Sequence, residues 1–177
     1  MKKILALLLL VVLSLSSCEK DDICAEETTP RLVLEFYDIS NPSTLRNVVN
    51  LKVKADGAAD YIVFNTSLAN TNPIRYLFNG NKLKLPIDIT QDTTKYSLIL
   101  SSTSTTPNED FLQFNYSRQN VFVSRACGYK TIFELNAFPN GVIKTDAITP
   151  DTFWIKGINI LTTTITTENE THIKIYF

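Results

Sequence analysis

Apolar residues recur at every second position through most of this chain, and this alternation limits the possible folds more than any other feature. In "RLVLEFYDI" (31–39), Leu32, Leu34 and Phe36 share one face, and in "NVVNLKVKA" (47–55) apolar and polar residues alternate cleanly. A period of two is typical of strands half-buried in a sheet. No segment shows the 3.6-residue period of an amphipathic helix. The chain is therefore predicted to be all-β.

Turn signals divide the alternating segments into about nine short strands. The dipeptides Asp56-Gly57 and Asn140-Gly141 favour turns or loops, and Asn79-Gly80 is a strong hairpin signal. A further turn is predicted at 118–120, and the segments 153–167 and 171–177 are expected to form a terminal hairpin. The predicted strands span 31–39, 47–55, 60–65, 81–89, 94–102, 110–117, 121–135, 153–167 and 171–177. Short strands separated by turns are typical of two packed sheets. The expected fold is an antiparallel β-sandwich, immunoglobulin-like or related.

Two residues interrupt this pattern in informative ways. Pro86 lies in the segment 81–89 and marks it as an edge strand or the end of a strand, because proline cannot donate to a sheet ladder. Gly128 interrupts the long run 121–135 beside Cys127. A glycine within a strand predicts a bulge or bend where a second backbone approaches closely.

The N-terminus has the features of a processed targeting signal. Lys2 and Lys3 precede the apolar segment 4–15, which is too short to span a bilayer comfortably. The following "LSSC" (15–18) resembles the lipobox of bacterial lipoproteins, in which the cysteine is acylated and the peptide is cut just before it. We therefore expect a signal peptide at 1–17, lipid attachment at Cys18, an acidic tether at 18–30 and one domain at 31–177. The alternative is a free or disulfide-bonded Cys18 after an ordinary signal cleavage.

Charge and cysteine content restrict the function further. Removal of residues 1–17 lowers the formal net charge from −1 to −3 and leaves no basic stripe, which argues against a nucleic-acid partner. Acylation of Cys18 would leave Cys24 and Cys127 as the remaining thiols. In an oxidising compartment these two form one candidate disulfide. Two unpaired thiols are the competing interpretation.

Catalytic and metal-binding patterns are missing from the sequence. The single histidine, His172, is predicted on a solvent-facing side of the last strand with Lys174 and Tyr176. Glu35 and Glu134 lie in apolar strands and could form the carboxylate pair of a hydrolase, but solvent-facing positions in sandwich strands are the favoured interpretation. No zinc spacing, phosphate loop or nucleophile elbow is present. We predict no enzyme activity, no cofactor and no metal, with a cryptic hydrolase as the alternative.

One segment, "SRACGYK" (124–130), combines residue types that suit ligand binding. Arg125, Tyr129 and Lys130 offer a guanidinium fork, an aromatic face and a second charge for an anionic or sugar-like group. The alternative is a disulfide-bearing bulge whose polar neighbours only satisfy backbone groups.

Three segments together resemble a known family: "CEKDDICAEETTPRLVLEFYD" (18–38), "NVFVSRACGYKTIFEL" (120–135) and "ENETHIKIYF" (168–177). They are similar to an uncharacterised, flavobacterial-type family of Bacteroidota lipoproteins with a domain of unknown function. The resemblance implies the anchor at Cys18 and pairing of Cys24 with Cys127, and it implies no activity. In addition, "EKDD" (19–22) resembles the export signal of surface-displayed lipoproteins in that phylum. We expect a lipid-anchored outer-membrane protein that faces the cell surface, with a periplasm-facing protein as the alternative.

These observations favour one function and leave two alternatives. The first hypothesis is a non-enzymatic interaction domain that binds an outer-membrane β-barrel or another envelope protein through a sheet face or an edge strand. A second is a binding module for glycans or another small ligand. A third is a small outer-membrane β-barrel, suggested by the aromatic ending "IKIYF" (173–177), although many predicted strands are too short for a membrane strand.

Overall fold

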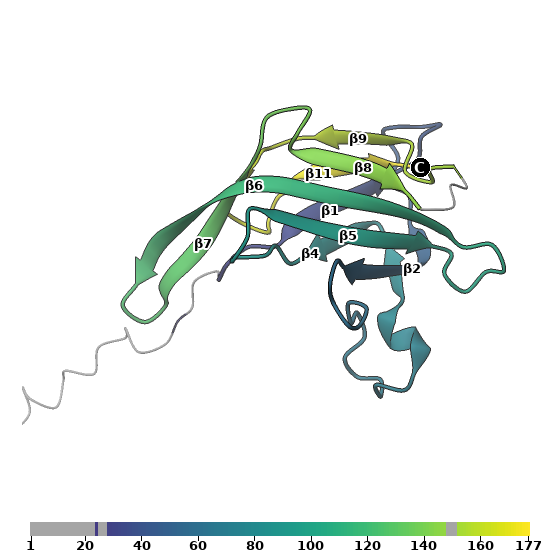
Figure 1. Cartoon of the computed structure of the whole chain (residues 1–177), viewed down its shortest axis with the longest axis horizontal. Coiled ribbons are helices and arrows are strands. Elements are labelled where there is room, and N and C mark those ends of the chain that lie inside the picture. Colours follow the sequence, from purple (N-terminus) through teal and green to yellow (C-terminus); the bar gives the residue numbers. More distant parts are fainter. Residues whose placement is uncertain (1–23, 25–27, 148–151) are drawn as a thin grey trace, which may run out of the picture.

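The computed structural model describes Cys24, residues 28–147 and residues 152–177 and contains two β-sheets (Figure 1). The smaller sheet has the order β4-β1-β11-β9, and the larger has the order β10-β7-β6-β5-β2-β3, with β8 also paired to β6. The smaller sheet contains β4 (Lys82–Leu85), β1 (Leu32–Tyr37), β11 (Ile173–Tyr176) and β9 (Gly157–Ile160). The larger contains β10 (Thr164–Ile165), β7 (Gly128–Leu135), β6 (Asn108–Ser124), β5 (Thr93–Leu100), β2 (Val48–Ala55), β3 (Phe78–Gly80) and β8 (Val142–Asp146).

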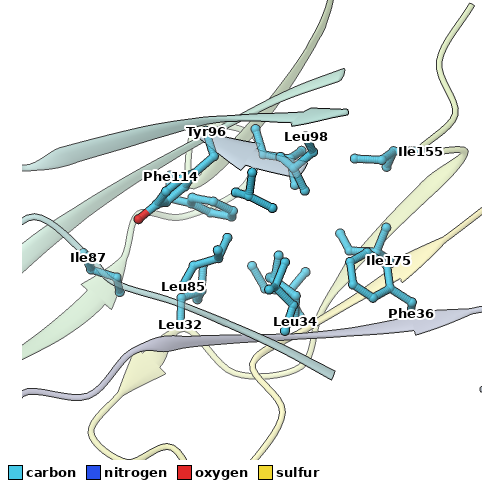
Figure 2. Packing of buried hydrophobic residues seen from close by; sticks show 14 of the residues in the cluster. Leu32, Leu34, Phe36, Leu85, Ile87, Tyr96, Leu98, Phe114, Ile155 and Ile175 are labelled. Carbon is cyan, nitrogen blue, oxygen red and sulfur yellow. The ribbon is translucent and has the colours of Figure 1, made fainter. Parts of the chain in front are cut away.

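The predicted all-β sandwich is confirmed, with one departure from antiparallel pairing. The two sheets enclose one apolar core, in which β1 contributes Leu32, Leu34 and Phe36 opposite side chains of β5 and β6. Figure 2 shows these residues facing Leu98 and other core side chains across the gap between the sheets. Strands β1 and β11 run in the same direction and form a parallel pair. Burial of both inner faces is what holds two such sheets together.

Strand β6 organises the larger sheet because it is long enough to pair with three other strands. Its first half lies between β5 and β8, and its second half pairs with β7. Strands β7 and β8 follow one another along the same edge of β6, separated by the loop 136–141. The backbone bonds Asn136 N–H to Asn115 O and Asn115 N–H to Gly141 O, both 2.9 Å, hold the two ends of this loop to β6. Consequently β7 extends past the core while β8 stays with the body.

Three local predictions are wrong for a common reason, which is that sequence pattern does not specify strand partners. The expected turn at 118–120 is part of the uninterrupted strand β6, and the chain instead reverses between Ser124 and Gly128. The segment 60–65 forms no strand, and its contact with β2 includes the bond from Ile62 N–H to Val53 O at 2.8 Å. After Asn79-Gly80 the chain moves from β3 in the larger sheet to β4 in the smaller one, so no hairpin forms there.

The C-terminal region links the two sheets. The expected terminal hairpin is present as the antiparallel pair β9 and β11, but between them β10 leaves to pair with β7 in the other sheet. Just before β9, the buried Trp154 donates from Nε1 to Leu98 O of β5 at 3.1 Å. Its ring also packs edge-on against Phe177 with centroids 5.8 Å apart. Pro86 follows the last residue of β4, an edge strand, as expected.

Candidate functional site

The β6–β7 hairpin forms an arm that projects from the body (Figure 1). From Val121 to Lys130 the two strands pair with each other, while β10 pairs with β7 only at Phe133 and Glu134. Gly128, the first residue of β7 after the turn 125–127, has φ +69°, a left-handed conformation that glycine adopts without a steric penalty. The strand register shifts beside it, between Phe122 and Ser124, so the predicted bulge or bend is present, although the run 121–135 forms two strands and not one. We call residues 121–130 the arm tip.

A disulfide joins the arm tip to the start of the described chain. Cys127 lies in the turn and is bonded to Cys24, with the two Cα atoms 4.8 Å apart. The expected pairing of these two cysteines is therefore present. Cys18, the expected lipid attachment, and the expected signal peptide at 1–17 lie outside the described residues. Cys24 follows Cys18 by six residues, so the disulfide joins the middle of the segment 18–30 to the arm tip.

The arm tip presents a pair of exposed aromatic side chains. Phe122 of β6 and Tyr129 of β7 are directly opposite in the strand register, and their rings pack edge-to-face with centroids 5.4 Å apart. Phe122 is 60% exposed and Tyr129 is 72% exposed. By strand alternation Tyr129 lies on the same face as Thr131 and Phe133, which are buried. The aromatic pair therefore continues the core-facing surface of the sheet beyond the end of the core.

The three residues predicted as a binding patch are placed on different sides of the arm. Arg125 is exposed in the turn, and Tyr129 faces Phe122. Lys130 follows Tyr129 in the strand and so points to the opposite face, where its Nζ donates to Thr166 O at 3.3 Å. Phe122 was missed as a partner of Tyr129. Treating "SRACG" (124–128) as a turn would have placed Phe122 opposite Tyr129.

Residues 28–31, which precede β1, are held along the edge of the body. Thr29 Oγ1 accepts a hydrogen bond from Thr131 N–H at 3.1 Å. Arg31 then binds Glu168 through both Nε and Nη2 at 2.8 Å, and Lys84 Nζ adds a third contact at 3.0 Å. The Arg31 fork is the largest cause of a pKa of about 2 for the Glu168 carboxyl. Together with the disulfide at Cys24, these contacts at Thr29 and Arg31 hold the chain that precedes β1 to the body.

The Glu168 cluster predicts a loss of stability in acid. Because the pKa of Glu168 is lowered from 4.5 to about 2 in the folded protein, the cluster stabilises the fold above pH 4.5 and loses this effect as the pH falls toward 2. Since the Arg31 side chain is 49% exposed, we expect a contribution of about 1 kcal/mol. The difference between the free energies of unfolding at pH 7 and at pH 3, measured with urea, should be smaller for Glu168→Gln than for the wild type. Glu170→Gln, at a neighbouring exposed position, is the control. An equal reduction of this pH 7 to pH 3 difference in both variants would contradict the prediction.

The structure gives no support to the hydrolase alternative. Glu35 is on the smaller sheet and binds Lys82 at 3.1 Å, whereas Glu134 is on the larger sheet and is exposed. The two carboxylates therefore do not form a pair. No group of three or more His, Cys, Asp or Glu side chains in the described chain is arranged to hold a metal ion.

The predicted solvent-facing position of His172 is wrong. His172 is fully buried, and its ring Nδ1 accepts a hydrogen bond from Val33 N–H at 2.8 Å. The backbone N–H of His172 donates to Val33 O at 3.0 Å. Strand β11 begins only at Ile173, so the alternation that would have placed His172 outside does not extend to it. Burial lowers the pKa of His172. The side chain acts as a structural hydrogen-bond acceptor.

A second exposed surface lies where β8 and β9 approach each other. Phe138 and Pro139 from the loop 136–141, Val142 of β8 and residues 158–160 of β9 line an apolar pocket of about 300 Å³. Phe138 is 90% exposed beside it. Strand β9 is an edge of the smaller sheet, and β8 is paired with β6 on one side. We call this surface the β8–β9 pocket.

Comparison with known proteins assigns the chain to a family. The model of the Family of unknown function (DUF6452) matches residues 50–177, nearly three quarters of the sequence. The chain belongs to the DUF6452 family. No curated protein and no solved structure gives a match. The DUF6452 match contains the arm and the β8–β9 pocket but begins after β1 and Cys24, so the disulfide joins a residue inside the matched region to one outside it.

The described part of this DUF6452 protein lacks a helix with the length and hydrophobicity needed to cross a membrane. Its helical structure includes the short 3₁₀ turn η2 (Pro73–Tyr76), which is capped by the Asn72 side chain.

Proposed function

We propose that this DUF6452 protein is a lipid-anchored outer-membrane protein of Bacteroidota whose β-sandwich binds another envelope protein without catalysing a reaction. Acylation of Cys18 after removal of residues 1–17 supplies the anchor. The segment Glu19–Asp22 favours display on the cell surface over a periplasm-facing position. An outer-membrane β-barrel is the expected kind of partner.

The observation that carries this proposal is the Cys24–Cys127 disulfide. Disulfides persist in oxidising compartments such as the bacterial periplasm and the cell surface, and are rare in the cytosol. The bond also gives the tether a mechanical role. Without it the body would still be joined to Cys18 through the backbone, but only the non-covalent contacts of Thr29 and Arg31 would hold that chain along the body. With it, Cys24 is also covalently fixed to the arm.

The β8–β9 pocket is the surface that best suits a protein partner. An apolar pocket with an exposed phenylalanine at its rim resembles the anchor sites of protein interfaces, where aromatic side chains carry much of the binding energy. The neighbouring strand edges can also accept a strand from a partner. Both features are made by the body and leave the arm tip free for another contact.

Site-specific photocrosslinking in intact cells tests this function. A photoreactive phenylalanine analogue at Phe138 should give one discrete crosslinked product, because the side chain is 90% exposed at the pocket rim. The same analogue at Ile74, which is 56% exposed on η2 outside the pocket, is the matched control. Mass spectrometry of the membrane fraction should show an acylated Cys18 peptide. An unmodified Cys18, or the same crosslinked products from both positions, would count against the proposal.

A further inference from the structure

The arm tip combines exposed aromatic residues with the point where the tether is attached. Phe122 and Tyr129 are mostly exposed, although the residues that continue their face toward the body, such as Phe133, are buried. Exposing two aromatic rings to water forgoes the stabilisation that burial would provide. A surface of this kind suits contact with an apolar or interfacial environment.

Chain length limits how far the arm tip can lie from the proposed anchor. Cys24 and Cys127 have Cα atoms 4.8 Å apart, and Cys18 precedes Cys24 by six residues. An extended chain covers at most about 3.6 Å per residue, so Cys127 at the tip lies within about 26 Å of Cys18. Because the acyl chains of Cys18 would lie in the hydrocarbon layer, the arm tip is the part of the described body tied most closely to the membrane.

We propose that the arm tip rests on the lipid bilayer, with Phe122 and Tyr129 in the interfacial layer and Arg125 beside the headgroup phosphates. This inference rests on the proposed lipid anchor at Cys18. Aromatic side chains are favoured at the membrane–water interface, and an exposed guanidinium pairs well with phosphate. The aromatic pair, 60% exposed at Phe122 and 72% exposed at Tyr129, is the main contact.

Covalent attachment of the chain to an acyl group at Cys18 would allow a small contact between the arm tip and the bilayer to persist. The anchor converts the encounter of the arm tip with the bilayer into an intramolecular step, so weak interfacial affinity is sufficient. Two points of attachment, the acyl group and the arm tip, also restrict how the body can turn. The arm therefore orients the sandwich on the membrane and lifts the β8–β9 pocket away from the lipid.

Depth-dependent fluorescence quenching of the full acylated chain tests the inference. Phe122→Trp and Tyr129→Trp place a reporter at the tip, and Phe138→Trp is the control at an exposed phenylalanine of the body. The native Trp154 is 5% exposed and gives the same background in all three. In phosphatidylcholine vesicles with brominated acyl chains, we expect roughly twofold stronger quenching of either tip reporter than of Phe138→Trp.

The outcomes separate this inference from the proposed function. Equal quenching of the tip reporters and Phe138→Trp, in a chain whose Cys18 is acylated by mass spectrometry, would overturn the membrane contact and leave the anchor standing. An unacylated Cys18 would overturn both. Two tip reporters are used so that a local disturbance at one position does not decide the result.

Discussion

Replacing Cys127 with serine is expected to lower the free energy of unfolding by about 4 kcal/mol. The Cys24–Cys127 disulfide closes a loop with a sequence separation of 103 residues, and a cross-link of this size restricts the unfolded chain by about 4.7 kcal/mol in the chain-entropy account. Urea unfolding of the purified chain, monitored by the fluorescence of Trp154, measures the difference. A midpoint within error of the wild type would contradict this prediction.

The same bond gives an internal control. Cys24→Ser removes the disulfide from the other end and should destabilise the protein by a similar amount, and the double variant should add little because the bond can be lost only once. Addition of a reducing agent should bring the wild type close to the single variants and leave the double variant unchanged. If the double variant were about twice as destabilised, packing of the individual side chains would be responsible and the cross-link would not.

As the pH rises from 4 to 7, the free energy of unfolding of the wild type is expected to fall by about 3 kcal/mol because of Asp110. Replacing Asp110 with asparagine should remove this fall. Asp110 is fully buried on the core-facing side of β6, where its Oδ2 accepts the Ile155 N–H at 2.7 Å. Burial is the largest cause that raises its pKa from 3.8 to about 6. The folded protein therefore binds a proton more tightly than the unfolded chain, so this stabilising effect is complete below pH 3.8 and is lost as the pH rises through 6.

The measurement is the free energy of unfolding across that pH range for the wild type and Asp110→Asn. The lowered pKa of His172 acts in the opposite direction, because its neutral form is the one that accepts the Val33 N–H. Subtracting the two profiles cancels this effect. Asp56→Asn, the same chemical change in an exposed turn, is the control and should leave the profile unchanged. Parallel profiles for the wild type and Asp110→Asn would show that Asp110 does not titrate as described.

Much of the fold was accessible from the sequence, while the candidate site was accessible only in part. The alternation in 31–39 correctly assigned Leu32, Leu34 and Phe36 to one buried face. Counting the cysteines that would remain if Cys18 were acylated gave Cys24 and Cys127 as a candidate disulfide, and the structure pairs them. The binding patch was predicted with Tyr129 and Lys130 together, but neighbouring residues of a strand point to opposite sides, and the structure pairs Tyr129 with Phe122 instead.

Side-chain periodicity alone made this chain an all-β sandwich, because a period of two defines which residues can share a buried face whatever the partner strand is. Only the tertiary structure decided which edges pair, since hydrogen bonds between distant strands depend on the free edges of all the others. It placed the turn of the arm at 125–127. It buried His172 and Asp110 in the core and left Phe122 and Tyr129 exposed beyond the core. Burial of His172 and Asp110 and exposure of Phe122 and Tyr129 both depend on how far one sheet covers the other, a relation between two surfaces that no single segment of sequence specifies.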